Sequence, residues 1–179
     1  VSFVSDVRYD LARRDFTVNA MAYNPREGII DLFGGADDID NRLIRAVGDP
    51  DTRFEEDSLR ILRGLRFASV LNFEIETVTA YSMIRKSSLL KNIARERVTE
   101  ELIKLLSGTG ASRILEDYSD IIFSLHSDFP KLVAAGTWGY AVKTFSRLPP
   151  NADLRLAALI LFLSRSVNIQ KKSITPVDI

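Results

Sequence analysis

Residues 53–67 read RFEEDSLRILRGLRF, and they decide the fold because apolar side chains recur in them at helical spacing. On an ideal helix the polar face holds Glu56, Asp57, Arg60 and Gly64. The opposite face is apolar and consists of leucines and Ile61. This stretch therefore predicts one helix with a compact polar face.

Helical spacing continues after this stretch. We expect a helix around residues 98–106, ended by the Ser-Gly-Thr-Gly sequence at 107–110. Further helices are expected near 76–86, 111–119, 137–147 and 153–166. Pro149 and Pro150 separate the last two, because proline cannot continue a helix.

The first 50 residues have a different character, with Gly and Pro between short segments. Residues 28–33, GIIDLF, are rich in β-branched and aromatic side chains and are followed by two glycines, which predicts a strand. We place the junction near Gly48 and Pro50. The fold class expected is mainly α, with a small α/β part in residues 1–50 and a helical array in residues 51–179.

Composition excludes several classes of protein. The 179 residues include 24 Lys and Arg, 24 Asp and Glu, one His and no Cys, so disulfides, zinc-thiolate sites and multi-His metal centres are impossible. Any metal ion must therefore sit on oxygen ligands. The 46% apolar content is enough for a folded core, which excludes a disordered chain. We expect His126 to be an ordinary residue at a helix end.

Charge and hydropathy bear on location and partners. The longest apolar run, residues 156–163, is too short to cross a bilayer, so a cytoplasmic protein is expected. The chain does not begin with Met, and we expect it to be a fragment of something longer. Zero net charge argues against strong non-specific binding to nucleic acid. Basic residues outnumber acidic ones only in residues 67–179, which leaves room for a local basic face.

Residues 13–20, RRDFTVNA, form a candidate anion site. Guanidinium forks suit phosphate oxygens, and Asp15 can accept a hydrogen bond from a ribose hydroxyl. The alternative is that Asp15 caps a short helix while Arg13 and Arg14 are solvated. The residues alone leave both interpretations open.

Asp57 and Arg60 form a second candidate site, because their polarity matches a base-pairing edge. Asp57 offers only acceptors and Arg60 only donors, and at i,i+3 they stand side by side. Cytosine and adenine each present an amino donor beside a ring-nitrogen acceptor, which this pair satisfies. The alternative is an ordinary surface ion pair, worth at most about 1 kcal/mol.

Several motifs occur together and in order. They are residues 13–20, the segment IDLFGG at 30–35 with Asp38, IRAVGDP at 44–50, EDSLR at 56–60, RFA at 66–68 and ERVTEEL at 96–102. With these motifs the chain resembles the class II tRNA nucleotidyltransferases, which are the CCA-adding enzymes, and the related bacterial poly(A) polymerases. The resemblance is dense from about residue 9 to 107 and thin afterwards.

The resemblance implies roles for particular residues. Arg14 contacts the triphosphate of the incoming nucleotide, and Asp15 and Asn19 shape the sugar and phosphate end of the pocket. Asp57 and Arg60 read the Watson–Crick edge of CTP or ATP. The remaining contacts and supports implied by the family come from Glu56, which orients Arg60, from Arg63 and Arg66 at the nucleotide, and from Arg97 and Glu101 behind the reading helix. For Arg97 and Glu101 a purely structural salt bridge is an equal alternative.

The resemblance also implies an architecture and an activity. Residues 1–50 are the end of a nucleotidyltransferase palm, or head, domain, and residues 51–179 are a helical neck and the start of an RNA-binding body. The activity implied is addition of C and A to tRNA 3′ ends, by attack of the RNA 3′-hydroxyl on the α-phosphate of CTP or ATP with release of pyrophosphate.

In this family Mg²⁺ is held by carboxylates upstream of the Arg-Arg-Asp motif. We therefore expect no catalytic or metal-binding residue in this chain and no activity from it alone. The alternatives are a bacterial poly(A) polymerase, which needs only ATP, and a catalytically inactive helical RNA-binding module.

Overall fold

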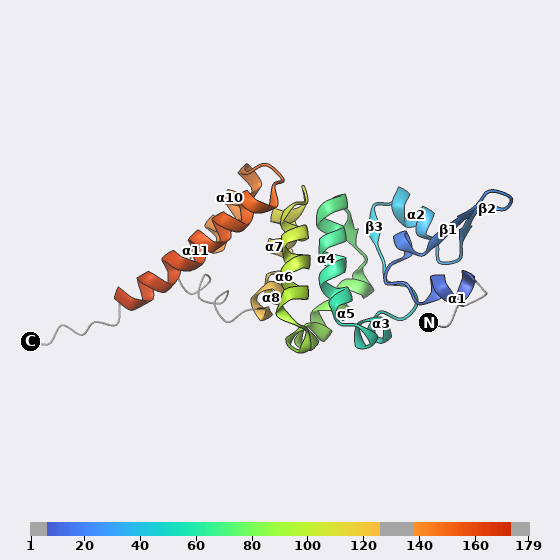
Figure 1. Ribbon diagram of the computed structural model, residues 1–179, viewed down its shortest axis with the longest axis horizontal. Coiled ribbons are helices and arrows are strands. Elements are labelled where there is room, and N and C mark those ends of the chain that lie inside the picture. Colours follow the sequence, from blue (N-terminus) through green and yellow to red (C-terminus); the bar gives the residue numbers. More distant parts are fainter. Residues whose placement is uncertain (1–6, 126–137, 173–179) are drawn as a thin grey trace, which may run out of the picture.

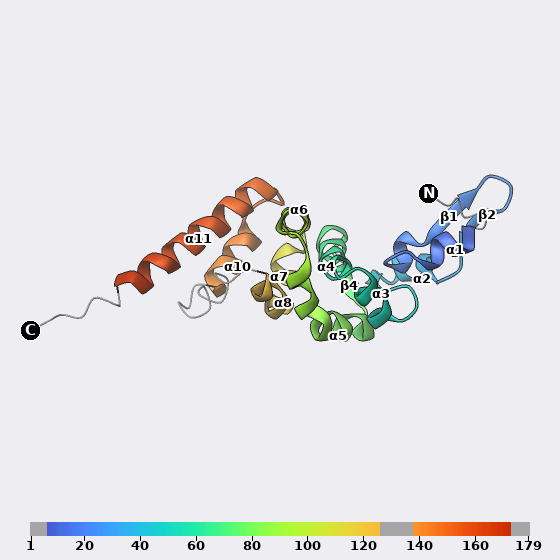
Figure 2. The same ribbon diagram turned by 60° about the horizontal axis from the view of Figure 1, so that its bottom comes forward.

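The computed structural model describes residues 7–125 and 138–172, with helices along most of their length (Figure 1). A small mixed unit lies at the N-terminal end and a group of helices follows. The helices α10 (Trp138–Arg147) and α11 (Ala152–Lys172) lie together at the far end in both views (Figures 1 and 2). The mainly helical fold class predicted from the sequence is confirmed.

The N-terminal unit is built on a hairpin. Strands β1 (Met21–Asn24) and β2 (Gly28–Asp31) pair antiparallel, with Met21 opposite Asp31 and Asn24 opposite Gly28. The expected strand over 28–33 is present but ends at Asp31, because its carboxylate accepts hydrogen bonds from the N–H groups of Phe33, Gly35 and Ala36 and turns the chain. Gly34 makes this turn with φ 73°, a conformation that favours glycine.

The other elements of this unit are short. They are the helices α1 (Val7–Ala12), η1 (Thr17–Asn19) and α2 (Gly35–Asp40) and the strand β3 (Leu43–Ile44). Strand β3 pairs parallel with β4 (Glu74–Ile75), which belongs to the helical half, with Leu43 opposite Glu74. The first 50 residues are thus tied to the helical array by backbone hydrogen bonds.

The helices of the middle part follow one another with short connections. They are α3 (Pro50–Glu56), α4 (Leu59–Leu71), α5 (Thr77–Lys86), η2 (Ser87–Asn92), α6 (Arg95–Leu106), α7 (Ala111–Asp117) and α8 (Ser119–Ser124). The helix expected over 98–106 begins earlier, at Arg95. The helix expected over 111–119 is two, because the chain turns at Tyr118. The helix expected over 153–166 extends to Lys172, and His126 lies outside the described residues.

The prediction of one continuous helix through residues 53–67 is wrong. Helix α3 ends at Glu56, and Asp57 has extended backbone angles, φ −151° and ψ 101°. The Asp57 Oδ1 atom accepts the N–H of Leu59 at 3.1 Å, so Asp57 terminates one helix and starts the next. Gly64 does not lie on a polar face: it is buried against Phe16 and Met83.

The core runs along α4, which packs against α6 (Figures 1 and 2). Side chains with no exposed surface include Phe16, Phe54, Ile61, Leu65, Met83, Leu106 and Ile114. At the far end the buried Arg155 of α11 donates hydrogen bonds to the carbonyl oxygens of Leu106 at 2.9 Å, Gly108 at 2.6 Å and Leu148 at 3.0 Å. Among the described residues, no helix is both long enough and apolar enough to cross a membrane.

Candidate functional site

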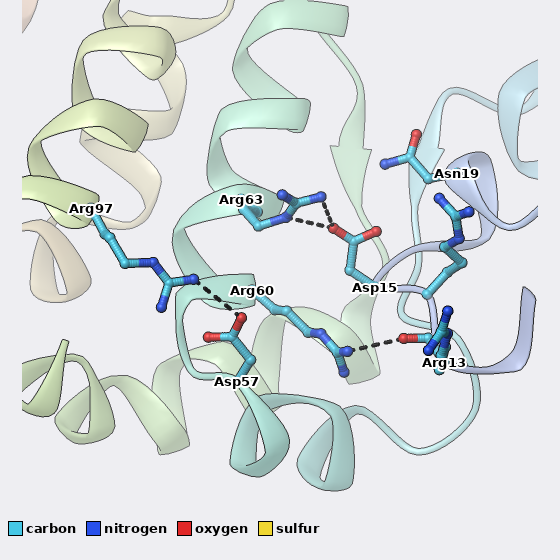
Figure 3. Close-up of a pocket in the computed structure, with 8 residues that line it drawn as sticks. Arg13, Asp15, Asn19, Asp57, Arg60, Arg63 and Arg97 are labelled. Atoms are coloured by element: carbon cyan, nitrogen blue, oxygen red, sulfur yellow. Dashed lines mark hydrogen bonds and ion pairs between the residues drawn. The ribbon is translucent and has the colours of Figure 1, made fainter. Parts of the chain in front are cut away.

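The two candidate sites of the sequence lie in one pocket of about 510 Å³ (Figure 3). Its walls come from the segment between α1 and η1, from the junction of α3 and α4, and from α4 and α6. The lining residues are Arg13, Arg14, Asp15, Asn19, Asp57, Arg60, Arg63 and Arg97. Segments far apart in the sequence thus place five arginines around two carboxylates.

The wall formed by residues 15–19 is held from behind. The N–H of Thr17 donates to Arg45 O at 2.9 Å, and the N–H of Val47 donates to Asp15 O at 3.1 Å. The Thr17 hydroxyl donates to the buried carboxylate of Asp38 at 2.6 Å, and Arg45 pairs with the same carboxylate. These contacts fix the backbone from which Asp15 and Asn19 reach the pocket.

Asp15 neither caps a helix nor stands free. Its side chain is only 6% exposed, and Oδ2 lies 2.7 Å from Nε and 2.6 Å from Nη2 of Arg63. Oδ1 accepts the N–H of Phe16 at 2.9 Å. Asp15, just before η1, therefore holds the guanidinium of Arg63 on α4 by an ion pair (Figure 3).

Arg60 is held from three sides. Its Nη1 atom lies 2.7 Å from Glu56 Oε2 and donates to Arg53 O at 3.2 Å, while Nη2 donates to Arg13 O at 2.9 Å. The side chain is 17% exposed. Glu56 thus contacts Arg60 from behind, outside the residues that line the pocket, and the guanidinium has little freedom to reorient.

Asp57 lies beside Arg60, although the cause differs from the one we expected. The two residues do not share a helix, and within the described part of the chain no ion pair joins them. Oδ2 of Asp57 instead lies 3.5 Å from Nη2 of Arg97 (Figure 3). The break between α3 and α4, and not i,i+3 spacing, places this carboxylate on the wall of the pocket.

The structure does not bring Arg66 or Glu101 into the pocket. Arg66 Nε lies 2.8 Å from Glu101 Oε2, and the Arg66 guanidinium stacks 4.0 Å from the centroid of the Phe67 ring. Arg66 lines a separate, more apolar cavity of about 370 Å³ next to Val70 and Leu71. Of the two α6 residues expected as supports, Arg97 lines the pocket and Glu101 does not.

Arg13 was absent from the binding residues that the resemblance implied, yet it lines the pocket. Its position beside Arg14 in the same motif is the signal that identifies it. Both arginines pair with Asp10 of α1, and these contacts hold the pKa of the Asp10 carboxyl below its usual value, Arg14 contributing most. No sequence pattern pointed to Asp10.

In the part of the chain that the structure describes, the side chains do not form a site for a metal ion. Among the described residues, no three His, Cys, Asp or Glu side chains gather in a way that could hold one. The carboxylates at the pocket are engaged with arginines, Asp15 with Arg63 and Asp57 with Arg97. The arrangement therefore supports binding of an anionic, hydrogen-bonding ligand.

Two parts of the chain match described protein families. Residues 1–45 match the poly A polymerase head domain, and residues 72–120 match the probable RNA and SrmB-binding site of polymerase A. The CCA-adding enzyme of Streptococcus agalactiae is 56% identical over 106 residues, which are 59% of this chain and 26% of that enzyme. The chain belongs to the family of CCA-adding enzymes and poly(A) polymerases.

Solved structures of CCA-adding enzymes share the fold. The Bacillus stearothermophilus enzyme in complex with CTP matches 64% of this chain and 29% of that one, with 45% identity and a TM-score of 0.62. The Thermotoga maritima enzyme complexed with tRNA matches 88% of this chain and 41% of that one, with 28% identity and a TM-score of 0.66. The chain spans 26% of the length of the Streptococcus agalactiae enzyme and 41% of the length of the CCA-adding enzyme of Bacillus licheniformis, to which it is 42% identical.

Proposed function

We propose that this chain is the nucleotide-binding part of a tRNA nucleotidyltransferase that adds C and A to tRNA 3′ ends, using CTP and ATP. The observation that carries the proposal is the meeting of the Arg-Arg-Asp segment and the Asp57–Arg60 segment in one pocket. Similarity to CCA-adding enzymes solved with CTP and with tRNA supports it.

The phosphates of the nucleotide are bound at the end of the pocket formed by Arg13 and Arg14. Their side chains are 68% and 50% exposed, so their guanidiniums are accessible to a ligand. Guanidinium groups bind phosphate oxygens through paired, charge-assisted hydrogen bonds. Asp15 and Asn19 shape the neighbouring wall, where the sugar lies, and Arg63, held by Asp15, adds a further positive charge.

The base is read by Asp57 and Arg60. Asp57 accepts a hydrogen bond from the exocyclic amino group, and Arg60 donates one to the ring nitrogen. Cytosine and adenine satisfy both contacts, whereas guanine and uracil present donor and acceptor in the reverse order. Because Glu56 and two backbone carbonyls hold Arg60, the donor keeps its place when no base is bound.

The remaining roles follow the family. Residues 1–50 are the end of the palm domain, and residues 51–179 are the neck and the start of a body that contacts tRNA. The 3′-hydroxyl of the RNA attacks the α-phosphate and pyrophosphate leaves. Mg²⁺ is held by carboxylates from outside this chain, so the purified 179-residue chain incorporates no nucleotide by itself.

Single-nucleotide assays on the full-length protein test this function. With tRNA that lacks its 3′-terminal CCA, CTP alone is expected to give C addition, and CTP with ATP to complete the end. Arg60→Ala is expected to abolish selective addition. Arg113→Ala, which removes an arginine paired with Glu74 away from the pocket, is expected to preserve it.

Other outcomes point to other functions. Incorporation of ATP only, in long tails, identifies a poly(A) polymerase. RNA binding without any incorporation identifies an inactive RNA-binding module. Incorporation by the isolated 179-residue chain contradicts the placement of the metal-binding carboxylates outside it.

A further inference from the structure

Two arginines of the pocket converge on one carboxylate. Asp10 Oδ1 accepts from Arg13 Nε at 3.0 Å and from Arg13 Nη2 at 2.6 Å. Asp10 Oδ2 accepts from Arg14 Nε at 3.2 Å and from Arg14 Nη2 at 2.7 Å. Each arginine therefore donates from its Nε–Nη2 edge to one oxygen of Asp10, and both carboxylate oxygens accept hydrogen bonds.

This geometry leaves donors for a ligand. An arginine has five N–H groups, and the contacts with Asp10 use one edge of the fork. Among the described residues, the Nη1 groups of Arg13 and Arg14 have no protein acceptor. Asp10 itself is 31% exposed and is not among the residues that line the pocket. Asp10 therefore contacts both guanidiniums without lining the pocket.

Asp10 also permits two like charges to be neighbours. Arg13 and Arg14 are adjacent in sequence, and without a shared anion their guanidiniums repel each other and take separate rotamers. One carboxylate between them reduces this repulsion while leaving the pair with a net positive charge. A local excess of positive charge is what a polyphosphate requires.

We propose that Asp10 is a positioning residue, which holds the guanidiniums of Arg13 and Arg14 side by side with their free edges available to the nucleotide's phosphates. The inference rests on the proposed function of the pocket. It assigns a role to a residue that touches the arginines and not the nucleotide.

The opposite role for Asp10 is that of a competitor, which occupies the arginines until phosphate displaces it. Without Asp10, a ligand would itself have to order the long side chains of Arg13 and Arg14, and this ordering lowers affinity. Repulsion between an exposed carboxylate and a phosphate is reduced by water and salt. The geometry favours positioning, since the pairing leaves one edge of each arginine free.

Binding of cytidine nucleotides to the full-length protein tests the inference. Calorimetry with CTP, CDP and CMP is performed on the wild type, on Asp10→Asn, which keeps the shape and removes the charge, and on Asp10→Glu. Asp10→Asn is expected to weaken CTP binding roughly fivefold, the size of one exposed charge pair. The loss is expected to diminish from CTP to CMP, and Asp10→Glu to restore part of it.

Controls separate this role from a general effect on folding. Glu74→Gln also removes a carboxylate paired with an arginine, Arg113, but outside the pocket, and is expected to leave CTP binding unchanged. Circular dichroism and thermal melting check the fold of each variant. If Asp10→Asn does not fold, Asp10→Ser replaces it in the same comparison.

Each result decides. Unchanged or tighter CTP binding by Asp10→Asn overturns the positioning role, and tighter binding supports the competitor. Equal weakening of CTP, CDP and CMP also overturns it, since a structural defect does not depend on phosphate number. A wild type that does not bind CTP removes the proposed function and, with it, this inference.

Discussion

In the proposed function, base selection depends most directly on Asp57. Its carboxylate can only accept hydrogen bonds, and Oδ2 lies 3.5 Å from Arg97 at the edge of the pocket. Asp57→Asn keeps the shape but supplies a donor as well as an acceptor, so it can also face the exocyclic oxygen of uracil or guanine. We expect the preference for CTP over UTP to fall about tenfold, which corresponds to one hydrogen bond of about 1.4 kcal/mol.

The measurement is kcat/KM for each of the four triphosphates with the full-length protein. Asp117→Asn is the control, because Asp117 is also exposed and near an arginine, 3.9 Å from Arg113, but lies outside the pocket. Unchanged selectivity in an active Asp57→Asn variant would show that Asp57 and Arg97 form an ordinary surface pair.

At single positions the sequence predicts which chemical groups a side chain offers, but it does not predict which residues that side chain contacts. The residue types at 15, 57 and 60 were enough to suggest an anion and base-reading site, because donors and acceptors follow from the side chains themselves. Their partners were not predictable: Asp15 pairs with Arg63, which is 48 residues away, and Arg60 donates to Arg13 O. Such pairings depend on how α4 lies against the segment before η1.

At the scale of elements, Gly64 marks where α4 meets the N-terminal unit. A Cβ atom at Gly64 would lie 2.7 Å from Phe16 Cζ and closer still to Met83 Cε, and neither side chain has exposed surface. Gly64→Ala is therefore expected to destabilise the fold by about 1–2 kcal/mol, since overpacking exceeds the gain in helix propensity. Urea unfolding of the full-length protein, followed by circular dichroism, measures the change.

Gly139 provides a matched control for this substitution. It lies in α10, and a Cβ atom there would meet nothing within 4 Å. Gly139→Ala is expected to be neutral or to stabilise the protein by up to about 1 kcal/mol. Equal effects at both glycines would mean that Phe16 and α4 do not pack as described.

The difference between predicted and observed elements has a physical cause. Apolar periodicity predicted the places of α5, α6 and α10, because it reports which side of a helix is buried. Apolar periodicity did not predict the break at residues 57–58, since a capping Asp between two helices leaves the apolar pattern intact. The strands β3 and β4 have two residues each, too few to show a period.

At the scale of the whole molecule, the two halves are joined more closely than composition indicated. The predicted boundary near residue 50 coincides with the start of α3, where Asp49 caps the helix through Thr52. However, β3 pairs with β4 across this boundary, and Phe16 from the first half lies in the core beside Phe67. The pocket lies on the same junction, so its shape depends on both halves.

Arg155 connects the far end of the molecule to the middle. Its side chain is 3% exposed, and it binds carbonyl oxygens at the ends of α6 and α10 in place of a carboxylate partner. Arg155→Met keeps much of the volume but removes the Arg155 donor from the Leu106 and Leu148 carbonyls, and it leaves Gly108 O with only the N–H of Ala111 at 3.3 Å. Each buried carbonyl that loses its partner costs about 1–3 kcal/mol, so α11 and the end of α10 are expected to separate from α6 more often.

Hydrogen exchange of the full-length protein measures this opening segment by segment. In Arg155→Met, amides of α11 and of residues 145–148 are expected to exchange faster, while those of α4 keep their protection because Leu62 and Leu65 remain packed. Arg147→Met is the control, since Arg147 is exposed in the last turn of α10. Faster exchange throughout α4 as well would show that the molecule unfolds as one unit, and unchanged exchange in α11 would show that apolar packing alone holds it.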